Sequence, residues 1–330
     1  MNLDRMLQRC RDGQWSVGDL DWSRTPRPMS RSDEESIVQF FTDMSGIERL
    51  AAALFEGQRR LTDDPVLEEI FALFVRDEIR HAHTARMLAD FYDVHRYRCY
   101  QPNPDLVKFT PHFVGAVRYL SKDIANAYIT AGEIILDVAL LRSINDYVGD
   151  PMSQEAMDRI NRDESRHLAV DYHMSGYYAS DAYLGQLASE PPRPLAERMR
   201  GTWALTRVLW YAGPFFREVF FRPMDLVDAS GRRIREAFRH IQLLSRRQRV
   251  RRLPFLRFMT WVQDLYNAPV VGKVLGGILL RILGIDPRVA VLLYTDADLA
   301  RAETMSFEAM GQEALSVKEV PSATESRLAH

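Results

Sequence analysis

The sequence predicts an all-α protein built around a four-helix bundle, and three observations carry this prediction. The pattern Asp-Glu-x-Arg-His occurs twice, at residues 77–81 and 163–167. A glutamate in an apolar, helix-forming stretch precedes each copy by about thirty residues: Glu48 in the first case, Glu133 in the second. A turn signal lies midway in each interval, in Thr62-Asp63-Asp64-Pro65 and Gly149-Asp150-Pro151. Two antiparallel helical hairpins with arms of equal length follow from this repeat.

The first thirty residues read as an irregular, polar lead-in. Pro26 and Pro28 oppose a helix near its end. Trp15 and Trp22 are the side chains expected to hold this segment on the body of the protein.

The first hairpin occupies residues 31 to about 93. Its first helix is expected to begin at Ser32, where Ser32-Asp33-Glu34-Glu35 has the form of a capping box, and to run to about Leu61. Its second helix is expected to follow Pro65 and to end near Asp93, since Asp before Pro is a favourable helix start.

The second hairpin completes a bundle that spans residues 31–180. A long connection, 94–111, contains three prolines and is expected to cross to the second hairpin. The third helix is predicted at 112–148, with a kink near Ser121, and the fourth runs from Ser153 to about Tyr178.

Residues 181–311 form a predicted helical extension that is basic and rich in aromatic residues. Between 191 and 260 there are 16 arginines, no lysine and five acidic residues. Helices are expected at 195–212, 231–248 and 255–283, and residues 312–330 are expected to be a disordered tail. One interpretation of the extension is a layer covering the bundle, with Trp203, Trp210 and Phe258 in the core and arginines outside.

The length and composition suffice for one large domain with a sizeable core, or for a domain with a substantial extension. The chain has 330 residues, 46% of them hydrophobic, and a formal net charge of −2. Cys10 and Cys99 form no disulfide framework, and the N-terminus lacks a secretory pattern, so we expect a cytoplasmic protein. No uncharged apolar run reaches the length of a membrane span, which disfavours a transmembrane helix.

The repeated motif brings metal-ligating side chains onto helix faces. Residues three apart share one face, so Glu78 can point with His81 at one ion, and Glu164 with His167. Equal hairpin arms place Glu48 level with Glu78, and Glu133 level with Glu164. Four glutamates and two histidines at one level of a bundle are the ligands of two carboxylate-bridged metal ions. A solvated helix face is the alternative for one copy, but two copies with matched glutamates favour metal binding.

On these residues the stretch from about 33 to 178 resembles the ferritin-like non-haem di-iron carboxylate proteins. That group includes multicomponent monooxygenases, acyl carrier desaturases, ribonucleotide reductase small subunits and arylamine N-oxygenases. The resemblance implies a ferritin-like bundle holding two iron ions, with manganese possible, and O₂ as cosubstrate with an external electron donor. The implied metal ligands are Glu48, Glu78, His81, Glu133, Glu164 and His167.

The resemblance also implies roles for neighbouring acidic residues. An aspartate in the position of Asp77 or Asp163 accepts the second ring N–H of a ligating histidine, commonly across the bundle, and so fixes its tautomer. Arg80 and Arg166 would neutralise these carboxylates or be ordinary surface arginines. Asp137, four residues after Glu133, is a candidate proton donor or extra ligand, although a hydrogen-bonded structural role is the stronger alternative.

Two positions separate the family members. The radical-bearing tyrosine of reductase small subunits lies four residues after the first motif's histidine, and that position is Ala85 here. The extra histidine ligand of the N-oxygenases lies four residues before the second motif's glutamate, which here is Ile160. Both differences argue against close membership of those two groups.

The function expected from this resemblance is a di-iron oxidoreductase that hydroxylates, N-oxygenates or desaturates an organic substrate. That substrate would be hydrophobic or bound to a carrier protein. The alternatives are an iron- or manganese-binding protein without an organic substrate, and an interaction module that uses the bundle as a scaffold. An apolar route to the metals would favour the first and a polar iron path the second.

The basic extension suggests partners. Arginine binds carboxylate and phosphate in a bidentate manner, so we expect an acidic carrier, a reductase or an anionic membrane surface. Nucleic acid is not expected because the whole chain is near neutral. A homodimer is possible, as is a peripheral membrane contact through 268–284. The arginines at 246, 247, 249, 251 and 252 are the predicted docking cluster.

Overall fold

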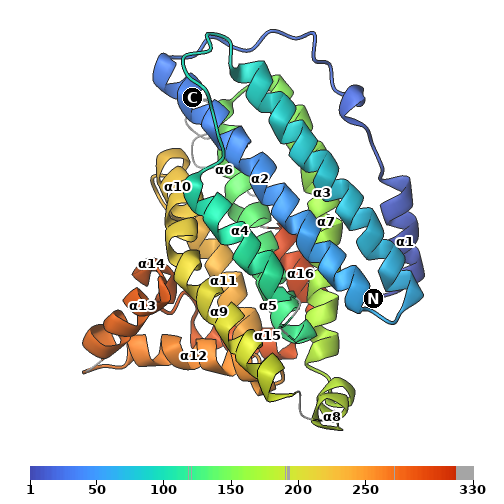
Figure 1. Cartoon of the computed structure of the whole chain (residues 1–330), viewed down its shortest axis with the longest axis vertical. Helices are drawn as coiled ribbons and strands as arrows, with labels where there is room; N and C mark the ends of the chain where they lie inside the picture. The colour runs from blue at the N-terminus through green and yellow to red at the C-terminus, as the bar shows by residue number, and fades with distance from the viewer. Residues whose placement is uncertain (118, 120, 190, 192–193, 271, 317–330) are drawn as a thin grey trace.

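Two helical hairpins form the centre of the computed structural model, which describes residues 1–316 except 118, 120, 190, 192–193 and 271 (Figure 1). Helices α2 (Arg31–Leu61) and α3 (Pro65–Tyr92) make the first hairpin. Asp64 caps α3 by accepting hydrogen bonds from the N–H groups of Val66 and Leu67, and Pro65 opens the helix. The described residues contain no strand, so the all-α prediction is confirmed.

The second hairpin is less regular than predicted. Its first arm consists of α4 (Pro104–Val117), α5 (Lys122–Ile134), the π-helical turn η2 (Ile135–Leu140) and α6 (Leu141–Val148); the second arm is α7 (Pro151–Tyr178). The predicted third helix is therefore broken rather than kinked, since Ser121 is the N-cap of α5. Helix α4 starts before Pro111, which lies inside it. Gly149, with φ of 55°, and the capping carboxylate of Asp150 form the predicted turn.

The lead-in is not irregular. Residues Leu3–Asp12 form α1, and Val17–Asp19 form the short helix η1. Helix α1 buries Met6, Leu7 and Cys10, and Asn2 caps its first turn by accepting the N–H of Arg5. The start of α2 was also predicted two residues late. Ser30 is its cap, since its hydroxyl accepts the N–H of Asp33 at 3.1 Å.

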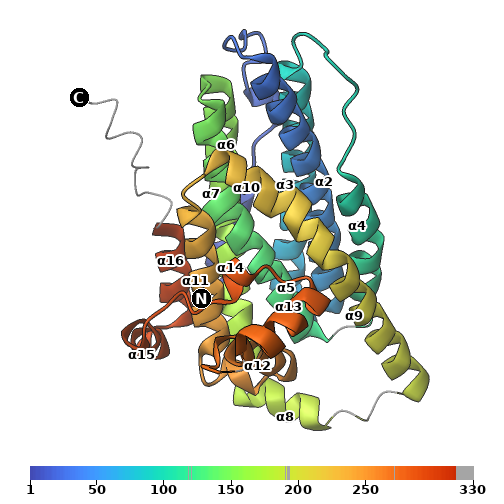
Figure 2. The ribbon, with the colours of Figure 1, turned by 90° about the vertical axis from the view of Figure 1, so that its left-hand side faces the viewer.

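The extension packs directly on the bundle. Helix α9 lies along α4, α11 lies against η2 and α5, and α16 lies against α7. Helices α12 and α13 lie across the lower end of the molecule in Figure 2. The elements are α8 (Asp181–Ser189), α9 (Leu195–Phe215), η3 (Phe216–Phe221), α10 (Arg222–Val227), α11 (Arg232–Arg246), η4 (Val250–Arg252), α12 (Pro254–Asn267), η5 (Gly272–Gly276), α13 (Gly277–Leu283), α14 (Pro287–Ala290), α15 (Asp296–Thr304) and α16 (Phe307–Ser316).

Helix α16 corrects the predicted tail, because residues 312–316 are helical. Ala314 in this helix is fully buried, so this turn is ordered by packing. Residues 317–330, the rest of that predicted tail, lie outside the described residues.

The extension also reverses the expected burial. Trp203, Trp210 and Phe258 are 64%, 74% and 40% exposed, so they do not form a core. Arg246 and Arg247 are buried instead. Arg246 donates to Gln263 and pairs with Asp264, and the Arg247 guanidinium stacks over an aromatic ring of α16. These two arginines connect helices inside the protein. The prediction that they belong to a surface cluster that docks a partner is therefore wrong.

One helical stretch in the described residues has the length and composition of a membrane span. It is Lys122–Val148, and 72% of its most apolar window is buried inside the protein. This stretch forms α5, η2 and α6 of the bundle. Its hydrophobicity is that of a core element.

Candidate metal centre

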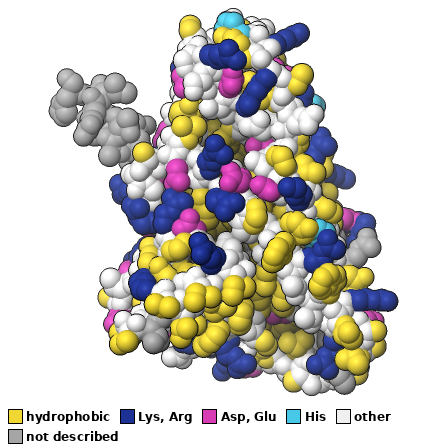
Figure 3. Space-filling model, turned by 60° about the vertical axis from the view of Figure 1, so that its left-hand side comes forward, with side chains coloured by type: hydrophobic (Ala, Val, Ile, Leu, Met, Phe, Trp, Pro, Cys, Tyr) yellow, Lys and Arg dark blue, Asp and Glu magenta, His cyan; other side chains and the backbone are white. Residues whose placement is uncertain are grey.

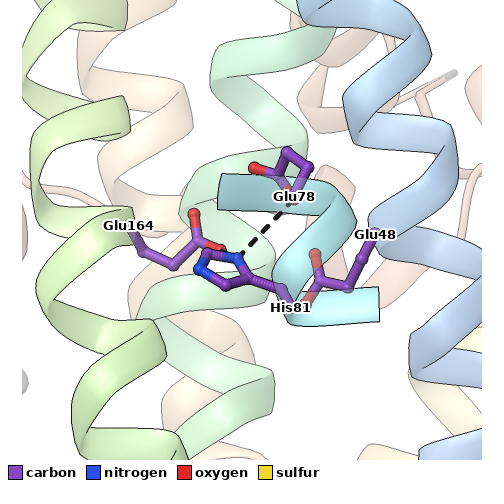
Figure 4. A group of neighbouring side chains, drawn as sticks. All are labelled: Glu48, Glu78, His81 and Glu164. Carbon is purple, nitrogen blue, oxygen red and sulfur yellow. Dashed lines mark ion pairs between the residues drawn. The ribbon is translucent and has the colours of Figure 1, made fainter. Parts of the chain in front are cut away.

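All six predicted metal ligands lie at one level inside the bundle. Helix α2 supplies Glu48, α5 supplies Glu133, and α3 and α7 each supply one Glu-x-x-His pair. None of the six side chains is more than 4% exposed: Glu48, Glu78, His81, Glu133, Glu164 and His167. Figure 4 shows four of them, drawn from α2, α3 and α7, converging on one point.

The six side chains form two overlapping groups. One ligand atom from each of Glu48, Glu78, His81 and Glu164 lies within 4.8 Å of the others. The same limit joins Glu78, Glu164, His167 and Glu133. Glu78 and Glu164 belong to both groups, which is the arrangement expected of carboxylates that bridge two ions.

The polar atoms that face the centre lack other partners. Both carboxylate oxygens of Glu48 and Oε2 of Glu133 are buried and accept no hydrogen bond in the described part of the chain. The carboxylate of Glu78 and Nδ1 of His81 are also buried, and their near polar neighbours are other members of the same cluster. Buried polar groups are almost always satisfied, and a cluster of unsatisfied anions is costly. Two divalent cations would satisfy these atoms and cancel the charge of four carboxylates, so the residues present fit a pair of metal ions.

The two histidine rings have a defined orientation. Nδ1 of His167 lies 3.0 Å from an oxygen of Glu78 and 3.0 Å from an oxygen of Glu164. Nδ1 of His81 lies 3.1 Å from Glu164. The Nε2 atoms point the other way, so Nδ1 is the nitrogen available to a metal.

The outer ring nitrogens meet the two motif aspartates across the bundle. Nε2 of His81 lies 3.0 Å from Asp163, and Nε2 of His167 lies 3.4 Å from Asp77. Each aspartate therefore contacts the histidine of the other hairpin, as the resemblance implied. An N–H donated to a carboxylate keeps the proton on Nε2 and leaves Nδ1 free to bind a metal.

Arginines and two residues of the lead-in complete this outer layer. Arg80 bridges Asp77 and Asp163, and Arg166 also contacts both carboxylates, so neither is an ordinary surface arginine. The indole N–H of Trp15 donates to Asp163 at 2.7 Å, and the Gln14 amide donates to Asp77 at 2.9 Å. Each Asp–His pair thus receives one hydrogen bond from the segment after α1. The anchoring predicted for Trp15 is confirmed, whereas Gln14 was missed.

Burial and mutual repulsion perturb the pKa values of the glutamates in the centre. Desolvation, followed by the charges of Glu78 and Glu164, raises the pKa of Glu48 well above its usual value, and the same two causes raise the pKa of Glu133. Burial opposes ionisation of Glu164 as well, but contacts with His167 and His81 lower its pKa. Protons and metal ions therefore compete for the outer glutamates Glu48 and Glu133.

Two further buried carboxylates lie near the centre. Asp137 is fully buried in the π-helical turn that follows Glu133, but it belongs to neither ligand group. Asp171, four residues after His167, is also fully buried, and neither of its carboxylate oxygens accepts a hydrogen bond from the described residues. Burial, together with the charges of Glu164 and Glu78, raises its pKa. Its spacing from His167 placed Asp171 on the metal-facing side of α7, a pattern that sequence reasoning missed.

Aromatic side chains close the centre on the side of α2. The ring of Phe74 lies 4.1 Å from that of His167, and Phe55 packs edge-on against the same imidazole at 5.2 Å. Phe55 is fully buried, so both rings belong to the packed interior around His167.

A cavity of 40 Å³ lies on another side, between α5, α7, α11 and the start of α12. Its walls combine aliphatic side chains with the polar residues Asp123, Asn126, Thr130, Ser175, Tyr178 and Ser245. Thr130 and Ile134 of its lining flank Glu133 on α5, although no candidate ligand lines the cavity itself. The cavity is thus next to the helix that carries Glu133.

Comparisons with known proteins do not assign the chain. No protein-family model matches it, and no curated protein has a matching sequence. The function proposed below therefore rests on the geometry of the centre.

Substitution of the outer aspartates should weaken metal binding. We expect Asp163→Asn and Asp77→Asn each to lower ferrous affinity by about 10- to 100-fold, because the histidines lose the carboxylates that orient them. Competition with a chromophoric chelator measures this change. Asp158→Asn, an exposed position on α7, is the matched control. Equal affinity in all these proteins would show that the Asp–His contacts do not tune the centre.

Proposed function

We propose that the chain is a di-iron oxidoreductase that uses O₂ to hydroxylate, N-oxygenate or desaturate an organic substrate. The observation that carries the proposal is the pair of buried ligand groups that share Glu78 and Glu164. Carboxylate and imidazole ligands without thiolate suit iron or manganese. When bound, a reduced iron pair would supply the electrons that activate dioxygen.

The surrounding residues support redox chemistry in several ways. Asp77 and Asp163 hold the proton on the outer nitrogen of each histidine, and Arg80 balances both carboxylates. The rings of Phe55 and Phe74 keep water from one side of the ligands. Asp171 lies buried close enough to sense the charge of Glu164, so it is a candidate to hold a proton near the centre.

In this proposal the cavity receives a small apolar group of the organic substrate. Its aliphatic walls suit an apolar group, while Thr130 and Asn126 offer hydrogen bonds that could orient a polar end. Its position beside the helix of Glu133 would place such a group near the metals. An external electron donor, and a carrier protein for the substrate, belong to this proposal.

Metal analysis followed by anaerobic reduction and exposure to oxygen tests this function. We expect the reduced, iron-loaded protein to consume O₂, whereas the Glu164→Ala variant should consume far less. Added apolar amines or acids that fit the cavity should change the rate of this reaction and yield an oxidised product. Iron uptake and release with no oxidised organic product would instead indicate an iron-handling protein.

Oxygenation should leave no stable tyrosyl radical. The position that carries the radical in reductase small subunits is Ala85 in this chain. Ala85 is fully buried and lies four residues after His81 on α3. Electron paramagnetic resonance of the oxygenated protein should therefore show no tyrosyl signal in proportion to iron. A strong signal of that kind would favour a radical-storing subunit, and Tyr172→Phe would then test the nearest buried tyrosine along α7.

A further inference from the structure

An exposed apolar surface covers the outer side of α9, α12 and the η5–α13 segment, and we call it the outer apolar face. On α9 the exposed residues recur at helical spacing and form one stripe. On α12 the rings of Phe258 and Trp261 stack at a centroid distance of 6.1 Å. The members of the face are Leu195, Met199, Trp203, Trp210, Phe258, Trp261, Val270, Val274, Leu275, Ile278 and Ile282, each between 40% and 89% exposed.

The three helices that carry this face pack on one another. Helix α13 packs against both α9 and α12. Gly213 of α9 and Gly284 after α13 touch so closely that a Cβ on Gly213 would lie 2.6 Å from the Cα of Gly284. Figure 3 shows hydrophobic side chains gathered over the lower part of the molecule, with Lys and Arg among and around them. Apolar patches of this extent mark interaction sites.

The charges on the same elements are mainly positive. Helices α9, α12 and α13 with η5 carry six basic residues and only two acidic ones, Glu197 and Asp264, a formal excess of four. Asp264 is already paired with Arg246. Within the described residues, no ion pair neutralises Arg198, Arg200, Arg257, Lys273 or Arg281. The outer apolar face therefore has a rim of cations without acidic partners.

We propose that the outer apolar face binds the surface of an anionic lipid bilayer. Tryptophan and aliphatic side chains would enter the headgroup boundary while the arginines meet lipid phosphates. A second copy of the chain is a poorer occupant, because a symmetric contact would bring two positive rims together. An acidic protein is also a poorer fit, since the middle of the face offers aliphatic groups rather than hydrogen-bond donors.

The cavity beside the helix of Glu133 shares a wall with the layer that carries the outer apolar face. Leu253 and Leu256, at the start of α12, line that cavity. The layer that would rest on the bilayer thus also forms a wall of the cavity. If the proposed oxidoreductase function holds, an apolar substrate could enter from the membrane, but membrane binding itself does not depend on that function.

Vesicle flotation with the full-length protein tests the proposal. The probes are vesicles of phosphatidylcholine alone and of phosphatidylcholine mixed with phosphatidylglycerol. We expect binding to the anionic vesicles and little to the neutral ones. Replacement of one exposed side chain on each helix, in the triple variant Trp210→Ser, Trp261→Ser and Ile278→Ser, should abolish it. Reversal of Arg200, Arg257 and Arg281 to Glu should weaken it by about a hundredfold.

Matched controls lie away from this face. Val94→Ser removes an exposed apolar side chain after α3, and Arg5→Glu with Arg9→Glu reverses two exposed charges on α1. These controls should bind as the wild type does, and iron content should be equal in all variants. Failure of the wild type to bind anionic vesicles would overturn the proposal. Binding by both triple variants that equals binding by the wild type would overturn it as well. A wild-type dimer that the apolar variant converts to a monomer, without vesicle binding, would assign the face to a second copy instead.

Discussion

Protein loaded anaerobically with ferrous iron is expected to hold about two ions per chain, one for each ligand group. Because Glu78 and Glu164 belong to both groups, Glu78→Ala or Glu164→Ala should remove nearly all bound iron. Glu48 and Glu133 each belong to one group, so replacing either by Ala should leave about one ion. Iron content after desalting, with helical circular dichroism as the folding control, separates these outcomes. Full iron content in the Glu78 and Glu164 variants would show that these two glutamates are not metal ligands.

The second large effect concerns stability, and its direction should depend on the metal. Glu48 and Glu133 are buried beside other carboxylates, and this raises their pKa in the folded protein. A raised folded pKa contributes stability at low pH that is lost as pH rises through that pKa. The metal-free protein should therefore be less stable at neutral pH than its double variant Glu48→Gln, Glu133→Gln. The variant should melt several degrees higher, since removing each carboxyl group that must be protonated or left unsatisfied on folding is worth about 1–3 kcal/mol.

Metal should reverse this order. Ferrous iron at a thousandfold excess over its dissociation constant stabilises the folded state by about 4 kcal/mol. The wild type should gain that stabilisation, whereas the double variant should gain little because it lacks the two outer carboxylates. Thermal melts with and without iron, alongside the exposed control Glu197→Gln, measure both effects. A metal-free double variant less stable than the wild type would mean that these glutamates are structural.

The centre was predictable because helical geometry fixes it locally. A Glu-x-x-His pair shares a face whatever surrounds the helix, and matched turns at Asp64 and Asp150 set the level of Glu48 and Glu133. The contacts between Asp77 and His167, and between Asp163 and His81, followed from the resemblance rather than from spacing.

Other features depended on information that local spacing does not hold. Helix α1 has apolar residues at positions 3, 6, 7 and 10, a helical pattern that was available but short. The hydrogen bonds from Gln14 and Trp15 depend on where α1 docks, which no local pattern states. The aromatic-rich composition of the extension suggested a core that includes Trp210, but composition does not show that this side chain is 74% exposed. The burial of Arg246 likewise depends on its distant partners Gln263 and Asp264.

The most direct test of the metal centre is a crystal structure of the iron-loaded protein with anomalous diffraction measured on both sides of the iron edge. Two iron peaks are expected inside the bundle, one facing Nδ1 of His81 and the other facing Nδ1 of His167, with Glu78 and Glu164 between them. A single peak, or iron bound only outside this cluster, would contradict it.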